Sequence, residues 1–214
     1  MTSVTVVDSG VVNLRNITRA LEHVGGHVRI DKDPASVLQA DRIVLPGVGA
    51  FASGMAELRT HHLDSAVKEA AQAGTPILGI CLGMQLLFDY SEEDGRCSGL
   101  GLIAGGVVPV PSKSVDGSRV RKVPHIGWNA LHFSTHRSER SDCCLAQTQQ
   151  GEYFYFVHSY MAVPENPAAI LAQAEYEGLM LNAAVSSENV MGLQFHPERS
   201  GPEGLKILER FVRN

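Results

Sequence analysis

One stretch of this chain, Ile77-Leu78-Gly79-Ile80-Cys81-Leu82-Gly83-Met84-Gln85, predicts both its fold and its chemistry. The first four residues form a short apolar run, which is typical of a buried strand, and Leu82 opens a helical pattern that extends to Phe88. Cys81 therefore stands at a sharp strand-to-helix turn between two glycines, which is the arrangement of a nucleophile elbow. A side chain at such a turn projects from the carboxyl end of a sheet, where open α/β folds bind ligands.

Predicted strands and helices alternate on both sides of this turn in the first half of the chain. The strands are expected at Val4–Val7, His27–Ile30, Ile43–Leu45 and Ile77–Ile80, and the helices at Asn13–His23, Leu63–Ala73 and Leu82–Phe88. This alternation predicts an α/β fold in which a central, mainly parallel or mixed sheet carries helices on both faces. We expect a single domain over residues 1–214.

The second half of the chain has a different pattern, because its strands are joined by turns and not by helices. We expect strands at Val107–Val110, Leu131–Phe133, Tyr153–Val157, Ile170–Ala174 and Val190–Phe195, and a final helix at Gly204–Val212. Ser134–Asp142 is polar and is expected to be an exposed loop. Much of this half of the protein is therefore expected to be antiparallel or mixed.

Composition bounds the classes of function. The chain has 214 residues, is 44% hydrophobic and carries a formal net charge of −5, so it can bury one core and is not predicted to bind nucleic acid. No apolar run reaches the roughly 18–20 residues that span a bilayer, and the N-terminus lacks a signal-peptide pattern. We therefore expect no membrane contact and a cytoplasmic location. The cysteines form neither a metal-binding spacing nor a disulfide framework, which fits a reducing compartment, and we expect no metal and no cofactor.

The thiol of Cys81 is the candidate nucleophile. A thiolate is the reactive form, and a helix N-terminus and a nearby imidazolium both stabilise it. The alternative is that Cys81 is a small buried core residue, as most free cysteines are. The glycine-flanked turn favours the nucleophile. Cys97, Cys143 and Cys144 lack such a setting, so we expect them to be structural.

A nucleophilic thiol needs a base, and the base needs a group that holds it. His196 follows an apolar strand in His196-Pro197-Glu198, and a carboxylate two residues further on would fix the imidazole tautomer and stabilise its protonated form. The alternative is a surface histidine beside a solvated glutamate. His158, which follows Tyr153–Val157, is a second candidate base, but it has no acidic neighbour in the sequence. The pattern favours His196 without excluding His158.

The elbow with Gln85, the late His196-Pro197-Glu198 and the loop Pro46–Gly49 together resemble class I glutamine amidotransferases. The resemblance extends over nearly the whole chain. Two further stretches, Pro124–Asn129 and Tyr153–Tyr160, resemble one branch of that family, the glutaminase subunits of imidazole glycerol phosphate synthase, which serve histidine biosynthesis. The resemblance implies hydrolysis of L-glutamine to glutamate and ammonia.

The same resemblance implies roles for individual residues. Cys81 would be the nucleophile, His196 the base and Glu198 the group that orients the base. The contacts with glutamine would come from Gly49, Gln85, Ser159 and Tyr160. The oxyanion donors would be the backbone N–H of Leu82 and, after a peptide reorients, the segment of Val48 and Gly49. Without the resemblance, Pro46–Gly49 would be an ordinary turn at the end of a strand.

The partner implied by the resemblance is a (β/α)8 cyclase subunit, which receives the ammonia and makes imidazole glycerol phosphate and an aminoimidazole carboxamide ribotide. The candidates for the interface are Asn13, Lys122, Pro124, Trp128, Tyr155 and Arg199. A single tryptophan suits an interface anchor, although a core position is the equal alternative.

Three positions near the expected interface depart from the family pattern. Ser9 and Val12 replace the tyrosine and second glycine that are usual in the first loop, and Arg199 stands where the family commonly has lysine. These departures leave the details of docking open and do not touch the triad residues.

Three alternative functions remain open from the sequence. The first is a glutaminase subunit that serves anthranilate, guanylate or pyridoxal synthesis, which Pro124–Asn129 disfavours. The second is a hydrolase or peptidase on the same scaffold, which Gln85 and the loop Pro46–Gly49 disfavour. The third is a non-catalytic binding module, which the intact triad residues disfavour.

Overall fold

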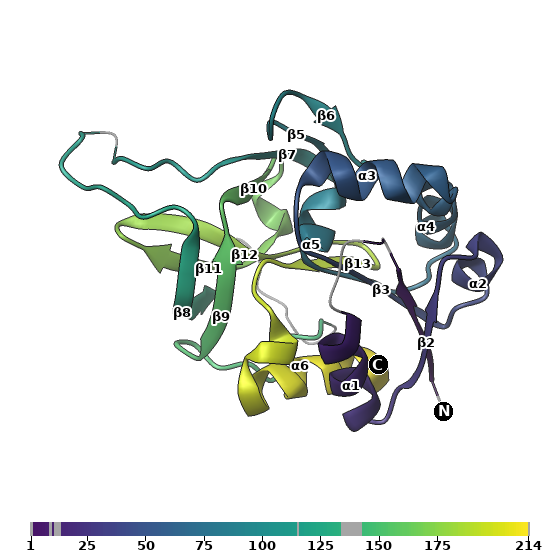
Figure 1. Ribbon diagram of the computed structural model, residues 1–214. Helices are drawn as coiled ribbons and strands as arrows, with labels where there is room; N and C mark the ends of the chain where they lie inside the picture. Colours follow the sequence, from purple (N-terminus) through teal and green to yellow (C-terminus); the bar gives the residue numbers. More distant parts are fainter. Residues whose placement is uncertain (1, 9, 11–13, 115, 134–142, 214) are drawn as a thin grey trace.

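A large mixed sheet forms the centre of the protein in the computed structural model, which describes all residues except 1, 9, 11–13, 115, 134–142 and 214 (Figure 1). In sheet order its strands are β2 (His27–Asp31), β1 (Ser3–Val7), β3 (Arg42–Gly47), β4 (Ile77–Cys81), β13 (Val190–Leu193), β12 (Leu179–Ser187), β11 (Ile170–Tyr176), β8 (His125–Phe133) and β9 (Tyr153–His158). The strands from β2 to β13 are parallel, and those from β13 to β9 are antiparallel. The predicted mixed sheet is confirmed.

Helices cover both faces of the parallel half (Figure 1). Those on one face are α1 (Leu14–His23) and α6 (Gly201–Arg213), and those on the other are α2 (Pro34–Leu38), α3 (Phe51–Thr60), α4 (Leu63–Gln72) and α5 (Leu82–Leu86). Successive strand residues point to opposite faces, so Leu78 and Ile80 pack with the α1 and α6 cluster, and Ile77 packs with the other. This two-sided burial explains why the parallel strands are apolar along their whole length.

A small second sheet lies beside the helix α5. Its strands, in order, are β10 (Tyr160–Pro164), β7 (Ile103–Pro109), β5 (Phe88–Ser91) and β6 (Cys97–Ser98). The strand β10 follows β9 after a single residue, Ser159, so the chain passes there from the large sheet to the small one. That crossing places the start of β10 beside α5, since Gln85 of α5 donates a hydrogen bond to the carbonyl of Tyr160.

The order of the strands brings together the ends of two segments that are far apart in the sequence. β4 and β13 are neighbours, and Leu193 lies opposite Ile80 in parallel register. The chain therefore leaves both strands at the same edge of the sheet, with Cys81 as the last residue of β4 and His196 shortly after β13. A short 3-10 helix, η2 (Pro197–Arg199), follows at once and holds Glu198 near that edge.

Most of the predicted elements are confirmed with shifted ends, and some were missed. The predicted helix Leu82–Phe88 was too long, because Phe88 begins β5, and the predicted strand Val190–Phe195 ends at Leu193. The elements α2, α3, β5, β6, β10 and β12 were not predicted. Ser134–Asp142, Ser9, Val12 and Asn13 lie outside the described residues.

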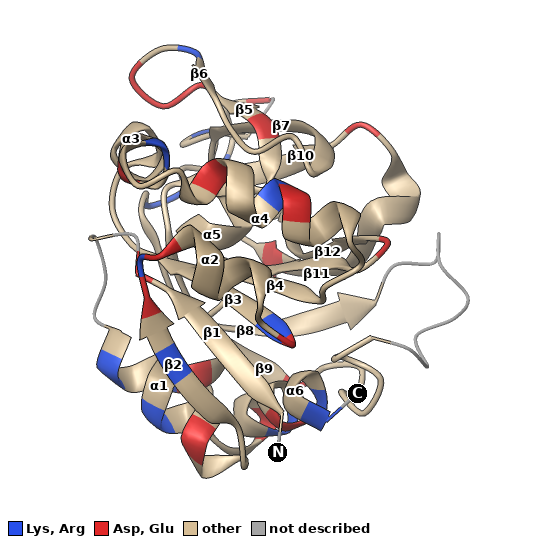
Figure 2. Cartoon of the chain, turned by 90° about the vertical axis from the view of Figure 1, so that its right-hand side faces the viewer, with Lys and Arg blue, Asp and Glu red and all other residues tan. Residues whose placement is uncertain are grey.

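Acidic and basic residues alternate along the helices in the described part of the chain. Lys and Arg are interspersed with Asp and Glu along the helices (Figure 2). Within the same described residues, no helix is both long enough and apolar enough to cross a membrane.

Candidate active site

The turn between β4 and α5 has a strained backbone at its central residue. Cys81 has φ 55° and ψ −112°, a conformation that side chains other than glycine rarely adopt. The flanking glycines are required by close backbone contacts, because a Cβ on Gly83 would lie 1.7 Å from the carbonyl oxygen of Leu45, and one on Gly79 would lie 2.7 Å from that of Gly83. Any larger residue at either position would push β3, β4 and α5 apart. The predicted elbow is therefore present.

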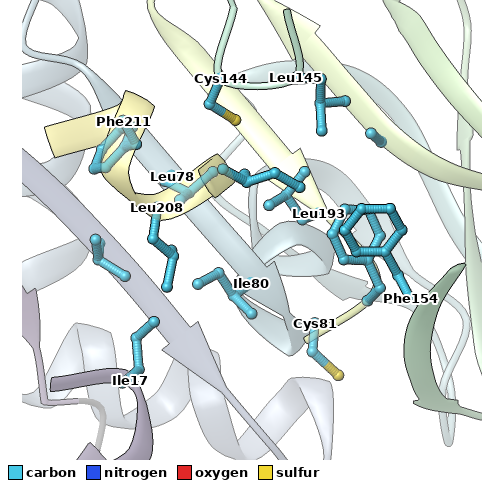
Figure 3. Packing of buried hydrophobic residues seen from close by; sticks show 14 of the residues in the cluster. Ile17, Leu78, Ile80, Cys81, Cys144, Leu145, Phe154, Leu193, Leu208 and Phe211 are labelled. Carbon is cyan, nitrogen blue, oxygen red and sulfur yellow. The ribbon is translucent and has the colours of Figure 1, made fainter. Parts of the chain in front are cut away.

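The sulfur of Cys81 lies at the rim of the apolar core. Figure 3 shows the side chain below Ile80, with the sulfur pointing away from the apolar side chains of the cluster. Cys81 is 6% exposed, and it lines a cavity of ≈ 340 Å³. The sulfur lies 3.7 Å from the carbonyl oxygen of Val157 and 3.8 Å from Nε2 of Gln194. The thiol is thus buried but borders on a space that a ligand could occupy.

His196 and Glu198 form a hydrogen-bonded pair beside this thiol. Nδ1 of His196 lies 2.8 Å from Oε1 of Glu198, and both side chains are largely shielded from water. Nε2 of His196 is buried and makes no hydrogen bond of normal geometry within the described part of the chain. The backbone of His196 is fixed by its N–H, which donates to the carbonyl of Tyr155 over 2.9 Å.

The charged form of His196 is strongly favoured. Burial alone disfavours an imidazolium, but the interactions of the ring with Cys81 and Glu198 outweigh burial and raise the pKa of His196 to about 10. The Cys81 sulfur is therefore close enough to stabilise the protonated ring, although it makes no hydrogen bond of normal geometry with Nε2. Such loose geometry is common in active sites without a ligand. A protonated imidazole beside a thiol is the setting that favours a thiolate.

His158, the second candidate base, has both ring nitrogens occupied. Its Nδ1 lies 2.8 Å from the carbonyl oxygen of Tyr160, and its Nε2 lies 3.0 Å from Nδ1 of His125. Because a carbonyl can only accept, Nδ1 of His158 carries the proton. Burial is the main cause that lowers the pKa of His158 to about 4, so the ring is neutral at physiological pH. The geometry favours His196 over His158 as the base.

The cavity beside Cys81 collects most of the other predicted site residues. Its walls include Gly49, Leu82, Gln85, Ser159 and Tyr160, together with Val48. These residues come from the end of β3, from α5 and from the junction of β9 and β10. Three separate parts of the chain thus converge on one space, as the resemblance implied.

Two polar residues of the site were not predicted from the sequence. Glu93 lines the cavity, and its Oε2 accepts a hydrogen bond from the backbone N–H of Phe51 at the start of α3. Gln194 is 1% exposed and lies between Gln85 and the sulfur of Cys81. Gln194 stands two residues before His196, so its proximity to a predicted base was a signal in the sequence. Glu93 gave no such signal, because only the three-dimensional fold brings it to the cavity.

The loop after β3 passes directly over the elbow. Gly47 lies opposite Cys81 in the register of β3 and β4, and a Cβ on Gly47 would lie 2.9 Å from that of Leu82. Gly49 has φ 104°, which glycine adopts without strain, and Val48 is 41% exposed. The predicted oxyanion segment therefore borders the same cavity as the thiol.

The predicted interface residues are found on the surface near this site, except for Asn13, which lies outside the described residues. Trp128 is 51% exposed and pairs across β8 and β9 with Tyr155, at 6.0 Å between ring centroids. The guanidinium of Arg199 lies 4.3 Å from the ring centroid of Tyr155. Lys122 and Pro124 are also exposed, and Pro124 lines the cavity as well. The alternative of a core tryptophan is wrong.

The other cysteines lie outside this cavity. Cys143 and Cys144 are buried in the core cluster, and burial raises the pKa of the Cys144 thiol. Cys97 is partly exposed in β6. Across the described residues, no group of His, Cys, Asp and Glu side chains has the arrangement of a metal site.

Comparisons with known proteins agree with this architecture. The family model of class I glutamine amidotransferases matches residues 5–214. The chain is 47% identical to the imidazole glycerol phosphate synthase subunit HisH 1 of Legionella pneumophila (strain Lens), with 100% of each chain covered. It is 45% identical to subunit HisH of Geobacillus thermodenitrificans, with 99% of this chain and 96% of the relative covered.

Solved structures resemble the protein in fold at lower identity. The structure of PurLQS from Thermotoga maritima includes a chain with a TM-score of 0.72 and 22% identity, over 99% of this chain and 97% of that one. The glutaminase domain of Trypanosoma brucei CTPS has a TM-score of 0.63 and 17% identity, over 100% of this chain and 95% of that one. The mixed sheet with its helices is therefore shared across these structures.

Proposed function

The chain belongs to the class I glutamine amidotransferase family, and we propose that it is the glutaminase subunit of an imidazole glycerol phosphate synthase in histidine biosynthesis. The relatives that carry this name match the chain over its full length at 45–47% identity. In this role the protein hydrolyses L-glutamine and supplies ammonia to a cyclase subunit. We expect it to act in the cytoplasm.

One observation carries the proposed chemistry. Cys81, whose backbone is strained, borders a cavity, and its sulfur interacts with the buried imidazole of His196, which the carboxylate of Glu198 holds. A nucleophile, a base and a group that orients the base are the three parts that covalent acyl transfer requires. A cavity of ≈ 340 Å³ also has room for an amino acid.

The proposed reaction begins from a thiolate at Cys81 and an imidazolium at His196. The sulfur attacks the side-chain amide carbon of glutamine, and a C–S bond forms as the carbonyl becomes an oxyanion. The C–N bond then breaks, and His196 gives its proton to the leaving ammonia. Water, activated by the neutral His196, hydrolyses the thioester to glutamate and restores the starting protonation states. Glu198 holds the ring and stabilises its charge throughout.

The walls of the cavity supply groups for the rest of the substrate. The backbone N–H of Leu82 starts the helix α5 directly after the nucleophile, which suits an oxyanion donor. The segment of Val48 and Gly49 is the second donor after its peptide reorients. Gln85, Ser159 and Tyr160 contact glutamine. The carboxylate of Glu93 adds a negative charge to the wall, which suits the α-ammonium group of an amino acid.

The proposed partner is a (β/α)8 cyclase that docks over the mouth of the cavity. The adjacent side chains of Trp128, Tyr155 and Arg199 form a surface of aromatic rings and one cation, which are residue types common at the centres of interfaces. Pro124 belongs both to this group of predicted interface residues and to the cavity wall. Ammonia would therefore be released close to the partner and sheltered from bulk water.

The test is glutamine hydrolysis measured with and without the cyclase and its nucleotide substrate. We expect low activity of the protein alone, a large increase with the liganded cyclase, and no activity in Cys81→Ala. Cys144→Ala is the matched control, because Cys144 is equally buried but lies outside the cavity. Activation by the synthase partner from anthranilate or guanylate synthesis in place of the cyclase would contradict the proposal, as would high activity that is independent of any partner.

A further inference from the structure

A chain of buried amide side chains leads from the start of β10 to the nucleophile. Gln85 and Gln194 are 6% and 1% exposed. Nε2 of Gln85 lies 3.2 Å from the carbonyl oxygen of Tyr160 and 3.0 Å from Oε1 of Gln194. Nε2 of Gln194 lies 3.8 Å from the sulfur of Cys81. Every member of this chain is withdrawn from water, so its hydrogen bonds must be satisfied internally.

The carbonyl of Tyr160, at one end of this chain, fixes the direction of its hydrogen bonds. The carbonyl of Tyr160 can only accept, so Gln85 must turn its NH2 group toward it. The second N–H of that group then donates to Oε1 of Gln194. If Gln194 were flipped, two NH2 groups would face each other in a buried site, which is unfavourable. Gln194 therefore presents an N–H donor, and not an oxygen, to the sulfur of Cys81.

The two polar neighbours of this sulfur favour opposite protonation states. The carbonyl oxygen of Val157 accepts from a neutral thiol and repels a thiolate. The N–H of Gln194 donates to a thiolate and gains little from a neutral thiol. When Cys81 loses its proton, the bond to Val157 is lost. Gln194 is then the neighbour that can replace it.

We propose that Gln194 is a positioning residue, which donates an N–H to the ionised sulfur of Cys81 and holds that sulfur toward the cavity. The inference deepens the proposed function, since it concerns the nucleophile of that reaction. The titratable groups around the sulfur are His196, which directly precedes η2 and is held by Glu198, His158 at the end of β9 and, across the cavity, Glu93. Gln194 acts beside these groups without titrating, so it shifts the balance between thiol and thiolate at every pH.

The test is the rate at which iodoacetamide alkylates Cys81 in the full chain, followed from pH 5 to 10 by peptide mass spectrometry so that the other cysteines are read separately. In Gln194→Met, which keeps the length of the side chain and loses the donor, we expect the rate at pH 7 to fall about tenfold, as for loss of one hydrogen bond to a charged group. We also expect the pH at which the alkylation rate is half-maximal to be higher in this variant. Gln173→Met is the control, because Gln173 is a partly buried amide that donates to Asn182 and not to sulfur.

Glutamine turnover separates this inference from the proposed function. With the activated complex, Gln194→Met should lower kcat about tenfold with little change in KM. Alkylation of Cys81 needs no glutamine. If the alkylation profile shifts in Gln194→Met but the native protein has no glutaminase activity, only the proposed function is contradicted. An unchanged alkylation profile in a folded Gln194→Met protein would overturn the role of Gln194.

A measurement on the native protein covers the case in which the variant does not fold. In ¹⁵N-labelled protein, the side-chain amide resonance of Gln194 should shift over the same pH range in which the alkylation rate rises, and that of Gln173 should not. A Gln194 resonance that does not respond over this range would overturn the inference.

Discussion

Two histidines flank the nucleophile, and they differ in almost everything except burial. His196 is 5% exposed and His158 is 6% exposed. The pKa of His196 is raised to about 10, whereas that of His158 is lowered to about 4. Burial disfavours the charged ring in both cases, so burial does not explain the difference.

The partners of each ring explain it. His196 has the carboxylate of Glu198 on one nitrogen and the Cys81 sulfur near the other, and both stabilise a positive charge. His158 has the carbonyl of Tyr160 on one nitrogen and a ring nitrogen of His125 on the other, and neither carries a negative charge. One position is therefore suited to hold and release a proton, and the other is suited to support the cavity wall. The comparison shows that the choice between two candidate bases depends on the groups that contact each imidazole ring, and not on how deeply the ring is buried.

The strongest way to break this comparison is to replace each histidine by asparagine, whose amide nitrogen can take the place of Nδ1. We expect His196→Asn to lower kcat of the activated complex by about 10³-fold or more, since it removes the base. His158→Asn keeps a donor for the carbonyl of Tyr160 and should lower kcat by about tenfold or less. Steady-state glutaminase assays compare the two, and losses of equal size would contradict the assignment.

A second variant changes the partner of His196 and leaves the ring in place. Glu198→Gln keeps a hydrogen-bond acceptor but removes the negative charge, so the pKa of His196 should fall toward its ordinary value. We expect kcat to fall by about 10²-fold to 10⁴-fold. NMR titration of the imidazole reports the change directly. A His196 that titrates near pH 10 in this variant would show that Glu198 is not the cause.

The smallest expected effect is a difference in how stability depends on pH. His196 binds its proton more tightly in the folded state, so its stabilisation is complete below about pH 6.5 and is lost as the pH rises toward 10. His158 binds its proton more weakly in the folded state, so stability is lost as the pH falls from about 6.5 toward 4. Each effect has a slope of at most about 1.4 kcal/mol per pH unit.

Urea denaturation of the native protein and the two asparagine variants, at steps from pH 4 to 10, measures these slopes. Above pH 7, the free energy of unfolding of the native protein should fall relative to that of His196→Asn. Below pH 6, the free energy of unfolding of the native protein should fall relative to that of His158→Asn. Parallel curves for all three proteins would contradict the opposite pKa shifts.

The sequence predicted the parallel half of the fold better than the antiparallel half. The strands of the parallel half are buried on both faces, so they appear as continuous apolar runs such as Ile77–Ile80. The strand β12 was missed because it is long and mixes apolar residues with Asn182 and serines, without a clean alternation. The helix α3 was missed because Gly54 interrupts its pattern, although contact with Leu82 and Leu86 explains that glycine.

The residues of the site also divide into those that the sequence predicted and those that it could not. Cys81, His196 and Glu198 could be selected from the sequence because each follows a recognisable strand end or a short motif. The choice against His158 could not be made, since it depends on the bonds of that ring to His125 and to the carbonyl of Tyr160. Glu93 was missed for the same reason, because its place in the cavity depends on how β5 and α3 pack and not on its neighbours in the sequence.

The central claim is that Cys81 reacts with glutamine because His196, and not His158, activates it. Incubation with a chloroketone analogue of glutamine, followed by peptide mass spectrometry, tests this claim most directly. We predict one adduct per chain, on Cys81, which forms at a similar rate in His158→Asn and far more slowly in His196→Asn. An adduct on Cys97, Cys143 or Cys144, or labelling of Cys81 that is lost in His158→Asn and unaffected in His196→Asn, would contradict it.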